Sequence, residues 1–408
     1  MRIAVVLFVA MISTCMHGQD RDTTLKSLYE GHRWFELREE VANTHAPIFY
    51  KAAVEAAFNQ APQAERDLEA VLRSPADRER VWEAQQLLLG LYFRLGKYRK
   101  ASEQAQLMLT QKPDATDIRN IAPILQVLST VQDQRVISEA RAPASIDIED
   151  KNIFLPVKVN GVEAHYILDN GFSLSGMSTS EAKRLNLHIH DVATNIDTMN
   201  GTKVNVRIAV VDDLDIAGVH LANVAFYVVP DEQPPFDQLE KGQQGILGLP
   251  VTIALNRFQW NPGARSFTVL PPSRRVNPTE GNLAFDGTSV FDRLDFRKRA
   301  LNFSLDLGAQ NTVLYPAFAH DFPDLAAIGS PETHKVTGVG GSTQIGSIVL
   351  RSLTFDVGGR EVFLKPAHIL LQDNNSTASW FAGNLGMDLL NQARTIEVDF
   401  SAMKISLR

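Results

Sequence analysis

Two short segments of the sequence place an aspartate after an apolar run and a glycine two residues later. Asp169 and Gly171 form the first such pair, and Asp306 and Gly308 form the second. A buried strand that ends in Asp-x-Gly presents a carboxylate at a tight turn, where glycine adopts backbone angles that other residues resist. If the two turns face each other, their carboxyls lie too close for both to be charged, so they share a proton and activate a water molecule.

The separation of the two aspartates recurs between other landmarks. Asp169 and Asp306 are 137 residues apart. Three pairs of glycines share this separation to within one residue: Gly201 and Gly338, Gly245 and Gly383, Gly248 and Gly386. This agreement indicates two copies of one supersecondary plan that arose by duplication. A pseudo-two-fold relation between the copies would bring the two Asp-x-Gly turns together.

From residue 147 onward the sequence alternates strand patterns with turn signals. The dipeptide Asn160-Gly161, for example, is a strong hairpin signal between two apolar runs. We therefore predict a mostly antiparallel β architecture of two lobes. Lobe 1 is expected over residues 147–272, a polar linker over 273–282, and lobe 2 over 283–408.

The order of hairpin, Asp-x-Gly loop, flap hairpin and apolar-apolar-Gly segment in each copy resembles the retropepsin-like and pepsin-like aspartic proteases. The resemblance covers residues 147–408, and its last segment reads GILGLP from Gly245 and GNLGMD from Gly383. It implies a bilobal acid-protease fold in which Asp169 and Asp306 hydrolyse peptide bonds of a polypeptide substrate. No metal or other cofactor is expected. Because one chain carries both lobes, no second subunit is needed to complete the pair.

The resemblance also assigns residues around the two aspartates. Two flap hairpins are expected to cover the cleft, with these residues at their turns: Asn200, Gly201, Gly338, Gly340 and Gly341. The active-site loops continue through Asn170-Gly171 and Leu307-Gly308. The family usually has Thr or Ser in place of Asn170 and Leu307, and that hydroxyl bonds to the opposite loop. An amide can still donate across, whereas a leucine side chain cannot. The alternative is therefore a degenerate protease-like protein that binds peptides without cutting them.

Residues 22–135 show apolar stripes at helical spacing and few β-branched runs. The stretch from Ala84 to Pro113 resembles a tetratricopeptide-type helical hairpin, with Gly96 at its turn. We predict a domain of α-helical hairpin repeats, which gives the chain a multidomain α and β organisation. The repeats serve either as a plain scaffold or as a groove for a protein partner, and a third interpretation makes the chain an adaptor with the β lobes as cargo. Residues 136–146 are predicted as a linker or connecting helix.

The first 19 residues have the pattern of an export signal. Arg2 precedes about ten apolar residues, too few to span a bilayer. We predict removal of this signal peptide, no membrane span afterwards, and a secreted or periplasmic location in a bacterium. Cys15, the only cysteine, lies within the signal. A lipoprotein anchored through Cys15 is disfavoured, because Thr14 before it is bulkier than such sites usually accept.

Charge and composition exclude further classes. The net charge of −7 and the absence of a long basic run argue against a nucleic-acid partner. A hydrophobic content of 44% is that of an ordinary globular protein. His188 and His190 alternate as metal ligands on a strand would, but no further His or Cys cluster accompanies them, so no metal site is predicted.

Overall fold

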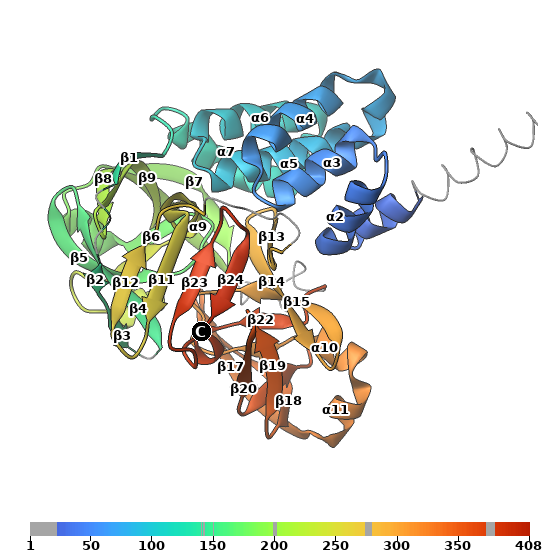
Figure 1. Cartoon of the computed structure of the whole chain (residues 1–408). Helices are drawn as coiled ribbons and strands as arrows, with labels where there is room; N and C mark the ends of the chain where they lie inside the picture. Colours follow the sequence, from blue (N-terminus) through green and yellow to red (C-terminus); the bar gives the residue numbers. More distant parts are fainter. Residues whose placement is uncertain are drawn as a thin grey trace, which may run out of the picture. The chain divides into compact units, whose positions relative to one another are not determined.

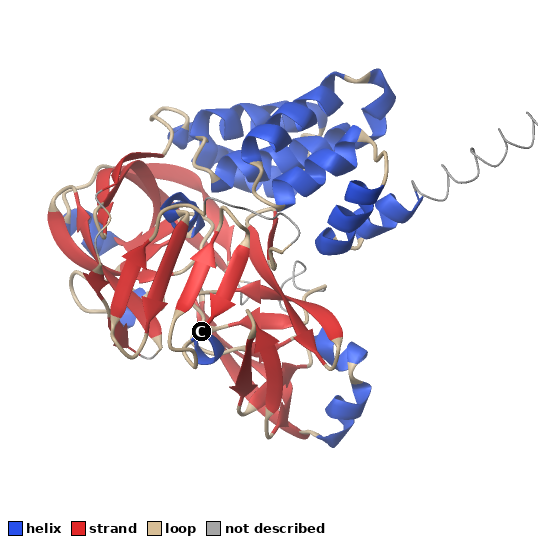
Figure 2. Cartoon of the chain, in the orientation of Figure 1, coloured by secondary structure: helices blue, strands red, loops and turns tan. Residues whose placement is uncertain are grey.

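The computed structural model describes residues 23–139, 141, 143–149, 151–198, 202–273, 280–372 and 380–408. Helices dominate up to residue 128 and strands dominate after it (Figure 2). The predicted order of a helical part followed by a mostly β part is therefore confirmed. The contacts divide the chain into two compact units, between Leu87 and Leu88. The predicted export signal lies outside the described residues.

The first unit contains helices joined by short turns. They are a helix at 23–30, α2 (Trp34–Asn43), α3 (Ile48–Ala57), α4 (Ala61–Arg73) and the 3₁₀ turn η1 (Pro75–Arg80) (Figure 1). α3 packs on α4 and buries Phe49, Tyr50 and Leu68. Asn59 closes the turn between them with a φ of 58°, a left-handed conformation that asparagine tolerates. Helical hairpins are thus present, while their tetratricopeptide character stays a prediction.

The second unit begins within one helix, and two more helices follow it before the first strand. These helices are α5 (Val81–Arg94), α6 (Tyr98–Gln111) and α7 (Thr116–Leu128). Gly96 at the turn between α5 and α6 has a φ of 64°. The hydroxyl of Tyr98 donates to the carbonyl of Asn223 at 2.9 Å and accepts from the N–H of Ala225 at 3.1 Å. Because the last helices bond to the β lobe in this way, the division falls inside the helical region and not at residue 135, where the sequence placed it.

Lobe 1 is built on a sheet that has nine strands within the described ranges. Its strands are β1 (Arg135–Glu139), β3 (Asp147–Glu149), β4 (Asn152–Val159), β5 (Val162–Leu168), β6 (Ser175–Ser178), β7 (Ile189–Asp197), β8 (Lys203–Ile216), β9 (Val219–Val229) and β10 (Gly245–Leu247). The strand order is β1-β9-β6-β10-β5-β4-β8-β7, with β3 beside β4. The short helices of this lobe are α8 (Thr179–Arg184), η2 (Phe236–Gln238) and α9 (Leu249–Leu255).

The segment predicted as a linker, 136–146, takes part in sheets instead. β1 pairs with β9 at the edge of the lobe 1 sheet. β2 (Ala144–Ser145) pairs with β12 (Ser266–Val269). The prediction failed because all five residues of β1 are exposed, so an edge strand of this kind has no alternation of apolar and polar residues.

Lobe 2 repeats the plan with a sheet of ten strands in the part that the structure describes. They are β13 (Leu283–Asp286), β14 (Ser289–Phe296), β15 (Arg299–Leu305), β16 (Val313–Leu314), β17 (Ser330–Gly338), β18 (Gly341–Leu350), β19 (Leu353–Val357), β20 (Arg360–Leu364), β21 (Ala367–Leu370) and β22 (Gly383–Leu385). Its short helices are α10 (Pro316–Asp321), α11 (Pro323–Ile328) and α12 (Met387–Leu390).

The strands that lead to the two aspartates have the same neighbours in both lobes. β5 pairs antiparallel with β4 and parallel with β10. β15 pairs antiparallel with β14 and parallel with β22. Parallel pairs inside a mostly antiparallel architecture were not predicted from the sequence. Their recurrence supports the duplication that the 137-residue spacing indicated.

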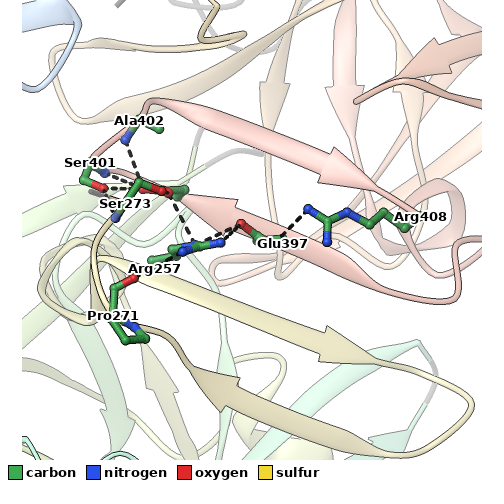
Figure 3. A network of polar contacts seen from close by, with 8 residues as sticks. Arg257, Pro271, Ser273, Glu397, Ser401, Ala402 and Arg408 are labelled. Atoms are coloured by element: carbon green, nitrogen blue, oxygen red, sulfur yellow. Dashed lines mark hydrogen bonds and ion pairs between the residues drawn. The ribbon is translucent and has the colours of Figure 1, made fainter. Parts of the chain in front are cut away.

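A third sheet joins the lobes, with the order β2-β12-β11-β23-β24. Its remaining strands are β11 (Arg257–Asn261), β23 (Ile396–Asp399) and β24 (Lys404–Leu407). β11 of lobe 1 pairs with β23 of lobe 2, and Arg257 bonds to Glu397 across this seam at 2.7 and 2.9 Å (Figure 3). Ser273 donates to Asp399 in the same network. The seam holds the lobes together from within one sheet.

Candidate active site

The structure brings the two predicted aspartates together, each at the end of an equivalent strand. Asp169 follows β5, and Asp306 follows β15. The N–H of Asp169 donates to the carbonyl of Leu247 at 3.0 Å, and the N–H of Asp306 donates to that of Leu385 at 3.1 Å. Because these bonds continue the parallel pairing with β10 and β22, both loops leave their sheets in the same way.

The glycines of the two loops allow the carboxyls to meet. A Cβ atom on Gly308 would lie 2.1 Å from Cγ of Asp169. A Cβ atom on Gly171 would lie 3.1 Å from Oδ1 of Asp306. Neither glycine has a left-handed φ, so the special backbone angle that the sequence suggested is not the reason for glycine here. Glycine is required at position 308 because the opposite Asp169 occupies the space of a side chain, and at position 171 the two carboxyls leave little room for one.

Each carboxyl accepts hydrogen bonds from its own loop, which fixes its orientation. Oδ1 of Asp169 accepts from the N–H of Gly171 at 2.8 Å. Oδ1 of Asp306 accepts from the N–H groups of Gly308 and Ala309, both at 3.0 Å. The two carboxyls also lie close enough for the charge of Asp306 to contribute to the raised pKa of Asp169. Because two negative charges at close range disfavour each other, this arrangement favours a pair that holds one proton.

The surrounding protein raises the pKa of both carboxyls, but to different extents. Burial, followed by the nearby charge of Asp306, holds the pKa of Asp169 well above its usual range. Burial also raises the pKa of Asp306, but hydrogen bonds from Asn384, Gly308 and Ala309 oppose that rise. Hydrogen bonds to a carboxylate favour its charged form. Asp306 accepts three such hydrogen bonds and Asp169 accepts one, which favours the charge on Asp306 and the proton on Asp169.

Asn170 links the two loops by itself. Its Nδ2 donates to the carbonyl of Leu305 at 2.7 Å, and its Oδ1 accepts from the N–H of Leu307 at 2.8 Å. Asn170 is buried, with 3% of its surface exposed. The corresponding Leu307 contributes its backbone to this link while its side chain packs in the core. The cross-link that the family makes with two hydroxyls is thus made here by one amide.

Asn384 was not identified from the sequence, although it bonds directly to the pair. Its Nδ2 donates to Oδ2 of Asp306 at 3.1 Å, and its Oδ1 accepts from the hydroxyl of Ser304. It lies on β22, whose three residues are all buried. A polar residue inside an apolar-apolar-Gly segment was the available signal, since buried amides need hydrogen-bond partners.

The flap residues are described for the second copy only. Asn200 and Gly201 lie outside the described residues. Gly338 ends β17 and Gly341 begins β18, and Gly340 lies between them with a φ of 97°. At this tip the N–H of Gly340 donates to Oε1 of Gln233 at 3.0 Å, and its carbonyl accepts from the hydroxyl of Thr202 at 3.0 Å. The second flap is therefore bonded to lobe 1, through a residue, Gln233, that the sequence did not single out.

Two further features bear on the sequence predictions. His188 and His190 contact each other edge to face, with ring centroids 4.3 Å apart. Groups of three or more His, Cys, Asp or Glu side chains suited to a metal ion are absent from the described ranges. None of the described helices combines the length and the apolar character needed to cross a membrane.

Comparison with known proteins relates one half of this site to a family. Residues 155–251 match the family model described as aspartyl protease. This aspartyl protease segment runs from β4 into α9, so it supports an aspartic-protease domain around Asp169. A retropepsin-like aspartic protease from Rickettsia conorii is among the similar solved structures, with 15% identity, 34% of this chain and 92% of that chain covered, and a TM-score of 0.24. No curated protein matches the chain.

Proposed function

We propose that the chain is an aspartic-type endopeptidase with Asp169 and Asp306 as its catalytic pair. The observation that carries this proposal is the close approach of two buried carboxyls, one from each copy of a duplicated plan. The match of residues 155–251 to the aspartyl protease family supports it. Two such carboxyls can hydrolyse a peptide bond without a covalent intermediate or a cofactor.

The unequal numbers of hydrogen bonds that the two carboxyls accept suggest a role for each. Asp306, as the charged member, accepts a proton from a water molecule held between the pair, and the resulting oxygen attacks the peptide carbonyl carbon. Asp169 gives its proton to the carbonyl oxygen, so a neutral gem-diol forms. The C–N bond then breaks as Asp306 passes its proton to the departing nitrogen. A diol hydroxyl returns a proton to Asp169, which restores the starting state.

The proposal extends to location and partners. The signal pattern over residues 1–19 supports export, with action in the periplasm or outside the cell. The substrate class is polypeptide, because the reaction acts on the amide common to all peptides. The helices described between residues 23 and 128 offer a surface for a protein partner, and plain scaffolding is the other role open to them.

The decisive test is cleavage of an unfolded protein by the purified mature chain between about pH 3 and pH 7. Asp169→Asn and Asp306→Asn should each abolish cleavage, and a statine-type inhibitor should block the wild type. Asp212→Asn is the matched control, because this aspartate is exposed on β8 and should leave cleavage unchanged. Cleavage that survives Asp306→Asn would remove the proposed mechanism.

Leu307 supports a second candidate, a protease-like protein that binds peptides without cutting them. Its apolar side chain leaves the cross-link between the loops to Asn170 alone. Peptide binding without cleavage by either wild type or Asp306→Asn would favour this candidate. Isothermal titration with peptides taken from the unfolded protein measures that binding directly.

A further inference from the structure

The two halves of the site differ at one register position behind the aspartates. In lobe 1, Ile246 on β10 pairs with Ile167 on β5. In lobe 2, Asn384 on β22 pairs with Ser304 on β15. Separations of 137 and 138 residues relate these two pairs, as they relate the other landmarks of the duplication. A polar pair therefore occupies in lobe 2 the place of an apolar pair in lobe 1.

The polar pair has one defined arrangement. The hydroxyl of Ser304 donates to Oδ1 of Asn384, which directs the amide nitrogen toward Asp306. A nitrogen in this place can only donate, and the carboxylate oxygen of Asp306 can accept. Only 5% of the Asn384 surface is exposed, so water does not readily replace this bond. The contact is therefore a directed one between buried groups.

We propose that Asn384, oriented by Ser304, is a positioning residue that keeps Asp306 as the charged member of the pair and leaves the proton on Asp169. This inference rests on the proposed function and deepens it. A donor at Oδ2 stabilises the carboxylate more than the neutral acid. The corresponding Ile246 has no polar side-chain atom to offer Asp169. The difference between the lobes thus assigns acid and base before any substrate is bound.

Other charged groups near the loop are engaged elsewhere. The titratable group that faces Asp306 is Asp169. Asp388 on α12 accepts from the N–H and hydroxyl of Thr312 at 2.8 and 2.7 Å. Lys151 donates to the side chain of Asn311 at 2.5 Å. Within the described residues, neither of these two groups bonds to Asp306, so Asn384 is the side-chain amide that distinguishes its two protonation states.

The test follows the protonation of the pair in the full mature chain. Aspartate labelled with ¹³C at the carboxyl is titrated by NMR, with Asp169→Asn and Asp306→Asn used to assign the signals. Asn384→Ile should raise the lower apparent pKa of the pair by about one unit, since a hydrogen bond to a charged group contributes energy of that order. The acid limb of the kcat/KM profile should move by the same amount.

Three more variants make the result decisive. The double variant with isoleucine at Ser304 and Asn384 reproduces the lobe 1 pair and should titrate like Asn384→Ile. Ser304→Ala should give a smaller shift in the same direction. Ile246→Val is the matched control and should titrate as wild type. If Asn384→Ile does not fold, Asn384→Ser, which is too short to reach Asp306, decides by the same titration.

The outcomes separate this inference from the proposed function. An unchanged titration in a folded Asn384 variant, with normal cleavage by the wild type, would overturn the inference alone. A shifted titration in a chain that cleaves nothing would support the inference and remove the proposed peptidase activity.

Discussion

Gly308 and Asp169 come from opposite lobes and lie so close that a Cβ atom on the glycine would approach the carboxyl carbon to 2.1 Å. The reciprocal contact, between Gly171 and Asp306, is looser at 3.1 Å. The approach of the two carboxyls thus depends on the absence of a side chain at both glycines. The requirement is stricter at Gly308 in lobe 2 than at Gly171 in lobe 1.

Gly308→Ala should therefore abolish most activity, because the alanine methyl would push Asp169 away. A displacement of about 1 Å at a reacting group can cost about 100-fold in rate, so we expect at least that loss in kcat/KM. Gly171→Ala should lose less. The control is Gly263→Ala, where the nearest atom would lie 3.6 Å away and activity should be kept. Equal activity of Gly308→Ala and Gly263→Ala would contradict the geometry.

Asn170→Leu should destabilise the chain, because it leaves the carbonyl of Leu305 and the N–H of Leu307 buried without the amide. Each unsatisfied group costs about 1–3 kcal/mol. Urea unfolding measures the loss in free energy of unfolding. Asn170→Thr, which restores the residue type usual in the family, should lose less. If Asn170→Thr and Asn170→Leu lower the free energy of unfolding equally, the hydrogen bonds of Asn170 do not stabilise the chain as described.

Stability should depend on pH through the aspartate pair. Because the pKa of Asp169 is raised on folding, the folded state binds the proton more tightly than the unfolded state does. The resulting stabilisation is complete below the unfolded value of about 4 and is lost as pH rises through the folded pKa. The free energy of unfolding of wild type should therefore fall relative to that of Asp169→Asn as pH rises from about 4 to 7. Chemical unfolding across this range checks the slope.

Asp324→Asn serves as the control for that slope. The ion pair with Arg297 lowers the pKa of Asp324, so its small contribution has the opposite sign and is lost as pH falls. Both side chains are largely exposed, so added salt should screen the effect. If the effect of Asp169→Asn on the free energy of unfolding changed with pH in the same direction as the effect of Asp324→Asn, the raised pKa of Asp169 would be contradicted.

Asp292 is a buried acid outside the active site, and its replacement should stabilise lobe 2. Its carboxyl oxygens have no hydrogen-bond partner of good geometry among the described residues, and burial raises its pKa well above its usual range. The residue 137 positions earlier is Leu155, which is also buried. Asp292→Leu should raise the melting temperature, more at pH 7 than at pH 4, because the unfolded chain releases this proton more readily than the folded chain does. Val290→Ala is a core control that should lower it at both pH values.

Gln233→Ala should loosen the second flap, because it removes the bond to the N–H of Gly340. We expect faster amide hydrogen exchange across residues 338–341 and a changed KM, with the pH profile of kcat unaltered. Gln238→Ala, on the same loop, is the control. Unchanged exchange at Gly340 would show that Gln233 does not hold the flap.

The sequence predicted the parts of the site that the duplication repeats. The common separation of about 137 residues located both Asp-x-Gly loops and both apolar-apolar-Gly segments. It did not find Asn384, because that residue breaks the repeat: its counterpart is the apolar Ile246. The strand at 135–139 was missed for a different reason, since an exposed edge strand has no hydrophobic period.

The parallel pairing of β5 with β10, and of β15 with β22, could not be predicted from the sequence either. Hairpin signals identify strands that are neighbours along the chain, whereas these partners are about 80 residues apart in sequence. The boundary between the two units could not be predicted either, because it depends on long-range contacts such as that between Tyr98 and Asn223. No local sequence pattern predicts a contact between residues that lie this far apart in the chain.

The unlike pairs Ile167/Ile246 and Ser304/Asn384 have a consequence for inhibitor design. Under the proposed roles of Asp169 as acid and Asp306 as base, a peptide lying across the pair meets different chemistry toward its two ends, so its direction of binding matters. A compound with a two-fold axis presents the same group to both aspartates, so it would match their unlike surroundings on one side only. Unsymmetrical compounds with a single orientation should be the tighter ligands.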